Sequence, residues 1–270
     1  MQRTIRPDEL SASQPLYRLG RISFVVKSAD AGFQNELARL LPACRVAPEV
    51  IYEIESDGNF RQLVGEILGL QSEYLWLSAA CVVSPAGHKV LISGNSSAGK
   101  STTVLALALR YGWKVLAEDL TCIDLHTGRI ISFATPFSLK KGTVELLQET
   151  ISMVPEPVAL GEWVPQSDLH AHGEYGSNLD LSLYFGTARH GEPMQVSVCS
   201  PGEYVRLLLP CSNLIHCAHG PDKLAEYVSS GTCYRVSGGS LSERLNLILE
   251  LTHRSRSMDT SEIGGAADVG

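Results

Sequence analysis

The 270-residue sequence lacks the features that would place it in a membrane or outside the cell. No apolar run approaches the roughly 18 residues that a membrane-spanning helix needs, because the best one, 75–83, is interrupted by Ser78. The opening MQRTIRPDEL has no apolar core of the kind that a secretory signal carries. These absences predict a cytoplasmic protein with no membrane segment.

Paired cysteines and a basic excess are also missing. The seven cysteines include no Cys-x-x-Cys pair, so we expect them to be reduced and mostly small core residues. The 22 Lys and Arg residues against 29 Asp and Glu residues leave a net charge of −7. A face that neutralises nucleic-acid phosphates usually shows as a basic excess, so the composition predicts no nucleic-acid partner. No G-x-S-x-G word supports a serine hydrolase.

The charge is uneven along the chain. Residues 142–188 contain seven acids and neither Lys nor Arg. This segment is either a docking surface for a basic partner or a solvated acidic region, and the second interpretation is favoured because charge runs usually only interact with water.

Patterns of apolar residues predict an α/β chain in which a small α/β unit, 1–73, precedes a larger domain, 74–254. In the first part we expect strands at 17–27 and 50–54 around a helix at 32–41. In the second part we expect a strand–helix alternation over 75–83, 89–93, 101–111, 114–117, 181–185, 194–199, 201–209, 234–236 and 241–252. Residues 255–270, rich in Ser, Gly and Asp, are expected to form a flexible tail.

A phosphate-binding loop stands out at 94–101, where GNSSAGKS fits G-x-x-x-x-G-K-[ST] at every fixed position. It follows the apolar strand KVLIS and opens an apolar helix, which is the context the motif requires. Gly94 and Gly99 let the backbone wrap so that N–H groups face phosphate oxygens. Lys100 reaches the β- and γ-phosphates, and Ser101 offers its hydroxyl to Mg²⁺. The segment predicts binding of a nucleoside triphosphate.

Two adjacent carboxylates follow the next predicted strand, at Glu118 and Asp119. Phosphoryl transfer needs a residue that orients or deprotonates the nucleophile and another that holds the metal. Ligands of α/β sheets sit at the carboxyl ends of strands, where this pair lies. Neighbouring strand residues face opposite sides, so one acid can face the substrate and the other the metal.

These words together resemble the HPr kinase/phosphorylase family and its HPr kinase-related relatives, whose fold is similar to the nucleotide-binding domain of phosphoenolpyruvate carboxykinase. The resemblance rests on LISGNSSAGKSTTVLALALRYGWKVLAED and LTCIDLHTGRIISFATPFSLKKG, and more loosely on MQVSVCSPGEYVRLLL and KLAEYVSSGTCYRVSGGSLSERLNLILEL. It covers about residues 74–253.

The resemblance implies an HPr kinase-like P-loop domain and a set of site residues. The phosphate site would be lined by Gly94, Asn95, Ser96, Ser97, Ala98, Gly99, Lys100, Ser101, Thr102 and the basic Lys140. Lys100, Glu118 and Asp119 would be catalytic, and Ser101 and Asp119 would hold Mg²⁺.

Three positions depart from the family pattern. Ser97 replaces a glycine, which we expect to be tolerated at negative φ. Glu118 replaces the usual Asp, and Ser78 stands where a strand His belongs to the family's acid–base apparatus. The reverse phosphorolysis reaction is therefore in doubt, whereas the kinase direction is less affected.

The function we expect is transfer of the γ-phosphate of ATP, with Mg²⁺, to a hydroxyl. The acceptor implied by the resemblance is a serine of a small protein or of a ribosomally made precursor peptide. A nucleotide-binding regulator without transfer chemistry and a small-metabolite kinase are the alternatives. Assembly into a homo-oligomer is left open.

Overall fold

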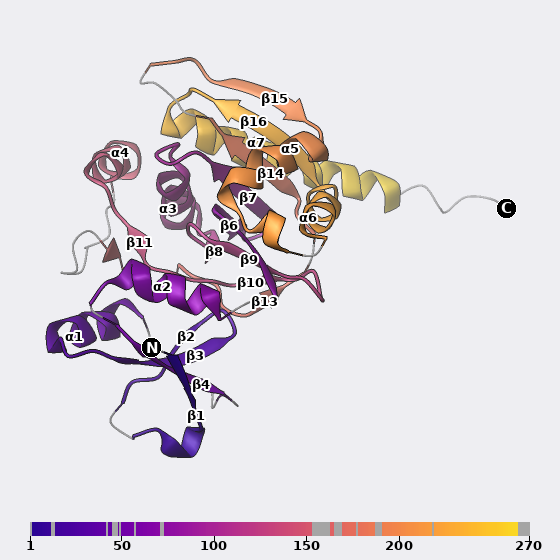
Figure 1. The fold of residues 1–270 in the computed structure, drawn as a ribbon. Helices are drawn as coiled ribbons and strands as arrows, with labels where there is room; N and C mark the ends of the chain where they lie inside the picture. Colours follow the sequence, from indigo (N-terminus) through magenta and orange to yellow (C-terminus); the bar gives the residue numbers. More distant parts are fainter. Residues whose placement is uncertain are drawn as a thin grey trace.

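The computed structural model describes residues 2–11, 14–41, 43–44, 48, 50–56, 58–70, 73–152, 163–164, 169–176, 178–186, 191–217 and 219–263. They form a mixed α/β protein, as predicted, with its strands arranged in several sheets (Figure 1).

The N-terminal part is a four-stranded sheet with two helices. Its strands are β1 (Gln2–Ile5), β2 (Tyr17–Leu19), β3 (Ile22–Lys27) and β4 (Ile51–Glu55), in the order β1-β4-β3-β2, and a 3₁₀ turn lies at Pro7–Glu9. The strand predicted over 17–27 is a hairpin instead, because Gly20 (φ 60°) turns the chain between β2 and β3.

Two helices, α1 (Ala31–Leu40) and α2 (Phe60–Gly69), accompany this sheet. The side chain of Asn59 caps α2 by accepting hydrogen bonds from the backbone N–H groups of Arg61 and Gln62. The sequence analysis missed α2. Its interior Gly65 weakens the local helical signal, and the burial of Leu63 and Ile67 compensates.

The larger part is built on a six-stranded sheet between two layers of helices. Its order is β15-β16-β14-β7-β6-β8, from β6 (Ala79–Val83), β7 (Lys89–Gly94), β8 (Lys114–Ala117), β14 (Leu181–Phe185), β15 (Gln195–Cys199) and β16 (Thr232–Ser237). Strands β7, β14 and β16 run parallel to one another.

Helices α3 (Lys100–Tyr111), α4 (Lys141–Ile151) and α7 (Leu241–Ile263) share one hydrophobic core on one face of this sheet. Helices α5 (Pro201–Leu208) and α6 (Gly220–Val228) pack in a second core on the other face, near the 3₁₀ turns Leu209–Cys211 and Leu214–His216. Helix α3 is buried almost all round, as its apolar sequence predicts, and ends at Gly112 in the left-handed region.

A small antiparallel sheet joins the two parts. It has the order β13-β10-β9-β5, from β5 (Tyr74–Leu77), β9 (Thr121–Asp124), β10 (Ile130–Ile131) and β13 (Glu174–Tyr175), and β11 (Phe137–Ser138) pairs with β12 (Trp163–Val164) beside it. Cys122, Ile131 and Phe133 share one core with the N-terminal helices. Arg21 adds ion pairs to Asp124 and Glu174. The N-terminal sheet is thereby fixed to the segment that follows β8.

Two expectations need correction. The strand predicted over 75–83 divides at Ser78, whose backbone N–H donates to the carbonyl of Cys211, so that β5 and β6 belong to different sheets. Helix α7 continues to Ile263, although a tail was expected from 255, because 253–263 contains neither Gly nor Pro to end it. Residues 264–270 lie outside the described residues.

Within the described ranges, no helix has both the length and the apolar character that crossing a membrane demands.

Among the acids of 142–188, Glu174 is paired with Arg21 and Arg129, and Asp180 accepts a hydrogen bond from the backbone N–H of Lys89.

Candidate functional site

The predicted phosphate loop connects β7 to α3. Gly94 closes β7 at φ 142°, and a Cβ atom there would lie 2.2 Å from the carbonyl oxygen of Phe185 on β14. Gly99 has φ 89° and directly precedes the first turn of α3. Gly94 therefore allows the close approach of β7 and β14, and Gly99 allows a left-handed turn before α3.

Ser97 does not meet the condition of a negative φ under which its replacement of a glycine was expected to be tolerated. Its φ is 63°, in the left-handed region where a non-glycine residue pays about 1–2 kcal/mol. The loop wraps as tightly here as it would with glycine, so that backbone geometry overrides the preference of the side chain. The loop stores strain at this position.

Lys100 lies at the start of α3 with only 8% of its surface exposed. Its ammonium donates hydrogen bonds to the carbonyl oxygens of Gly94 (3.0 Å) and Asn95 (3.3 Å). These contacts hold the ammonium against the backbone of the loop.

Arg244, on the first turn of α7, supports the loop from beneath, and the sequence analysis missed it. It is 5% exposed, and its guanidinium donates to the carbonyl oxygens of Ala98 and Gly238 and stacks over the ring of Phe185 at 4.7 Å. By donating to the Ala98 carbonyl, Arg244 stabilises the backbone conformation of the loop.

The two carboxylates lie immediately after β8, as predicted. Glu118 is only 5% exposed, and this burial raises its pKa from 4.5 to about 7. A hydrogen bond from the Ser101 hydroxyl opposes the rise, while the neighbouring Asp119 charge adds to it. Burial also raises the pKa of Asp119, against the lowering effect of Lys100, Lys140 and Arg61.

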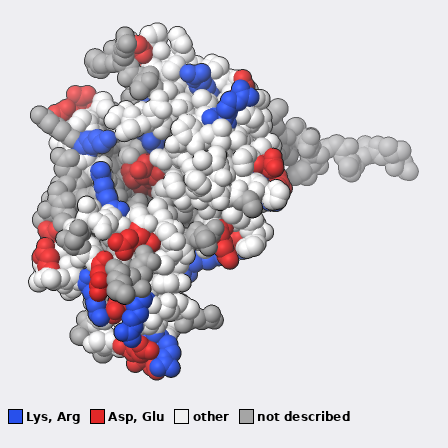
Figure 2. Space-filling view, viewed as in Figure 1, with Lys and Arg blue, Asp and Glu red and all other residues white. Residues whose placement is uncertain are grey.

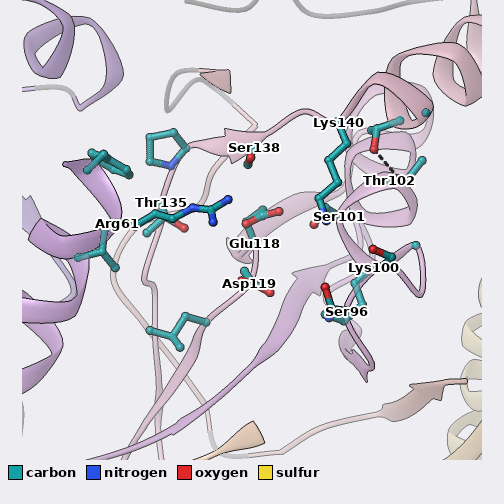
Figure 3. A pocket seen from close by; sticks show the side chains of 18 of the residues that line it. Arg61, Ser96, Lys100, Ser101, Thr102, Glu118, Asp119, Thr135, Ser138 and Lys140 are labelled. Carbon is teal, nitrogen blue, oxygen red and sulfur yellow. Dashed lines mark hydrogen bonds between the residues drawn. The ribbon is translucent and has the colours of Figure 1, made fainter. Parts of the chain in front are cut away.

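These side chains face one cavity of about 710 Å³. Of the predicted site residues, it brings together Ser96, Ser97, Gly99, Lys100, Ser101, Thr102, Glu118, Asp119 and Lys140. Figure 3 shows Glu118 and Asp119 between Arg61 on one side and Ser101 and Lys140 on the other.

Three predicted residues are not among those lining the cavity. Gly94 packs against β14, as described above. The Asn95 side chain accepts a hydrogen bond from the Tyr184 hydroxyl at 3.1 Å. Ala98 is 3% exposed and contributes to the core beneath the loop. These three residues support the shape of the loop, and their backbone groups remain part of it.

The sequence analysis missed the remaining walls of the cavity. Helix α2 supplies Phe60, Arg61, Val64 and Leu68, and other segments supply Leu120, Thr135, Pro136, Ser138, Gly142, Thr143 and Leu146. Thr143 could have been suspected from the sequence, since it lies three residues after Lys140. Its hydroxyl lies 3.2 Å from the hydroxyl of Thr102. Nothing in the sequence links α2 to the loop, because their contact is purely tertiary.

Charges of both signs meet at this cavity. Its charged lining residues are three cations, Arg61, Lys100 and Lys140, and the two acids. On the face shown in Figure 2, Lys and Arg side chains lie around Asp and Glu side chains, whereas much of the upper part is uncharged. A site with this charge set favours a polyanion near the cations.

The donor set suits Mg²⁺ held together with a phosphate ligand. Among the described residues, no group of three or more His, Cys, Asp or Glu side chains is arranged to hold a metal ion by itself. Mg²⁺ at phosphate sites is usually held by one or two protein oxygens, substrate phosphates and water. The Ser101 hydroxyl and the two carboxylates fit that mode.

Comparisons with known proteins add little. No protein-family model matches the chain, and no curated protein matches it significantly. Among solved structures 84 chains match, including the Hpr(Ser) kinase/phosphatase from Coxiella burnetii. That match has 13% sequence identity and a TM-score of 0.34, and it covers 68% of this chain and 98% of the other. So low a TM-score supports no conclusion about the activity of this chain.

Proposed function

We propose that this protein is an ATP-dependent phosphotransferase that uses Mg²⁺ and phosphorylates a hydroxyl group. One observation carries the proposal: a buried carboxyl group with a pKa of about 7, Glu118, lies in the same cavity as the lysine of a complete phosphate loop. A base is most effective when its pKa is close to the working pH. Plain nucleotide binding does not require such a group.

The nucleotide would bind with its phosphates on the loop. The backbone N–H groups at the start of α3 and the Lys100 ammonium would hold the β- and γ-phosphates, and Lys140 would add a charge from the facing wall. When bound, Mg²⁺ would neutralise charge on these phosphates, held by Ser101 and Asp119.

Glu118 would accept the proton of the acceptor hydroxyl. The hydroxyl oxygen then forms a bond to the γ-phosphorus, the bond from that phosphorus to the bridging oxygen breaks, and ADP leaves with the electron pair. The carboxylates lie beside the loop, and we place the acceptor hydroxyl next to them, on the side of the cavity opposite to Lys100. In Figure 3 that side is the wall formed by α2.

The acceptor class follows from the sequence resemblance alone. We infer a serine of a small protein or of a ribosomally made precursor peptide, and an HPr kinase-like architecture for the P-loop domain, residues 74–254, behind the N-terminal unit. We also propose a cytoplasmic location, which is the prediction made from the sequence. Apolar residues of α2 line the cavity, so an acceptor whose hydroxyl is flanked by apolar groups would fit there.

The test is phosphate transfer. The protein is incubated with Mg·ATP and the peptides or small proteins encoded beside its gene, and products are analysed by mass spectrometry for added phosphate. Lys100→Ala is expected to abolish transfer and greatly weaken ATP binding, whereas Asp119→Ala abolishes transfer and leaves most of the ATP affinity. Lys223→Ala, on the exposed side of α6, is the matched control.

Normal turnover in either site variant would overturn the assignment. Tight ATP binding with an intact γ-phosphate for every acceptor would favour a nucleotide-binding regulator. Phosphate on a free amino acid or sugar would identify a small-metabolite kinase.

A further inference from the structure

Helix α2 of the N-terminal part forms the wall that faces the phosphate loop. Phe60, Arg61, Val64 and Leu68 all line the cavity. The spacing from Arg61 to Val64 and Leu68 places these three on one face of the helix. That face is apolar except for one cation near its N-terminal end.

The position of α2 is fixed against the segment that carries the two carboxylates. Leu63 and Ile67, on the adjoining face of the helix, are 1% and 0% exposed. They share a core with Cys122 of β9, which begins two residues after Asp119. This packing therefore fixes the position of Arg61 relative to Glu118 and Asp119.

The Arg61 side chain extends into the cavity toward the carboxylates, as Figure 3 shows. Its guanidinium makes no ion pair within the described residues, and its charge lowers the pKa of Asp119. A guanidinium offers several donors in a planar fork that matches phosphate oxygens. It is exposed to the cavity and available to a ligand there.

The balance of charge identifies the ligand group. With both acids ionised, the cavity has one excess positive charge, and without Arg61 it has none. Mg·ATP still carries about two negative charges, and charge on the moving phosphoryl group must be stabilised in the transition state. An additional anionic acceptor would leave the site more negative, so the phosphoryl group is the better partner.

We propose that Arg61, supplied by the N-terminal part, contacts the phosphoryl group during its transfer and stabilises its charge. This inference rests on the proposed function. Lys100 would hold the group from the loop side and Arg61 from the opposite side, with the acceptor hydroxyl entering between Arg61 and Glu118. The N-terminal part is then a component of the catalytic centre, not an appendage.

The test uses a mimic of the transferring group, so that no acceptor need be known. Calorimetry measures the affinity for Mg·ADP alone and for Mg·ADP with aluminium fluoride, in the wild type, Arg61→Ala and Arg61→Lys. Arg39→Ala, an exposed arginine on α1, is the matched control. Thermal unfolding checks that each variant is folded.

We expect Arg61→Ala to lose about 100-fold in affinity for the aluminium fluoride complex and less than about threefold for Mg·ADP, because a transition-state cation acts selectively. Arg61→Lys should retain part of the affinity, and Arg39→Ala all of it.

Equal affinities of the wild type and Arg61→Ala for the fluoride complex would overturn the inference while leaving the proposed function intact. An equal loss for both ligands would also overturn it, by making Arg61 a general nucleotide contact. A wild type that gains nothing from aluminium fluoride would count against phosphoryl transfer itself, and against Arg61 with it.

Discussion

Replacing Glu118 by Gln changes the pH dependence of stability in a direction that burial dictates. In the folded protein the pKa of Glu118 is about 7, against 4.5 for the free group. A raised pKa means that the fold disfavours the ionised carboxylate. The contribution of Glu118 to stability is therefore complete below pH 4.5 and is lost as the pH rises through 7. Gln keeps the size and a hydrogen-bond acceptor for Ser101 but cannot ionise.

The magnitude follows from the two pKa values. Their difference corresponds to roughly 3 kcal/mol when ionisation is complete, and most of it falls between pH 5 and pH 8. Contributions from other groups are largely common to both proteins and cancel. We therefore expect the stability advantage of Glu118→Gln over the wild type to be larger at pH 8 than at pH 5, by roughly 2 to 3 kcal/mol.

The measurement is urea unfolding at several pH values without nucleotide, with the free energies extrapolated to water. Glu145→Gln, on the exposed side of α4, is the control and should show no such trend. A Glu118→Gln advantage that stays constant within about 0.5 kcal/mol from pH 5 to pH 8 would refute the reasoning. It would mean that Glu118 is ionised at no cost, and its role as a base near neutral pH would fail with it.

Three further substitutions test the phosphate loop. Gly94→Ala should destabilise the protein by about 3 kcal/mol, measured by urea unfolding, because the new Cβ would lie 2.2 Å from the Phe185 carbonyl oxygen; an unchanged midpoint would show that the strands separate easily. Ser97→Gly should stabilise by up to about 1 kcal/mol in the same assay, since relief of a positive φ exceeds the entropy that glycine adds to the unfolded chain, and a net loss would contradict the strain assigned here. Arg244→Lys should weaken ATP binding about tenfold in calorimetry, because an ammonium lacks the planar fork with which the guanidinium bonds the carbonyls of Ala98 and Gly238 together. Wild-type affinity would exclude a supporting role for Arg244.

Local patterns predicted the parts of the site that are contiguous in the chain. The loop with Lys100 follows a short apolar strand and opens an apolar helix, and that context is written within about twenty residues. Glu118 and Asp119 follow the next strand and were placed by the rule that strand ends carry ligands. Ser97 shows the limit of such reasoning, because its φ depends on the shape of the whole loop and not on its own preference.

The helix that completes the cavity could not be predicted in this way. Its interior glycine weakened the local signal for α2, and nothing in the sequence relates Arg61 to a lysine 39 positions further on. Arg244 is still more distant in the chain, yet it holds the carbonyl of Ala98. Pairings of this kind depend on how separate elements pack.

By itself, the sequence predicted a phosphate loop, the residues that form it and the two carboxylates that follow it, because short-range backbone geometry and strand order encode these features. Only the tertiary structure decided that the carboxyl group of Glu118 is buried and that Arg61 faces it. The position of Arg61 depends on α2 packing against the segment after β8, where Leu63 and Ile67 are buried in a shared core with Cys122. A pKa and an opposing charge are properties of surroundings, and those are assembled from distant parts of the chain.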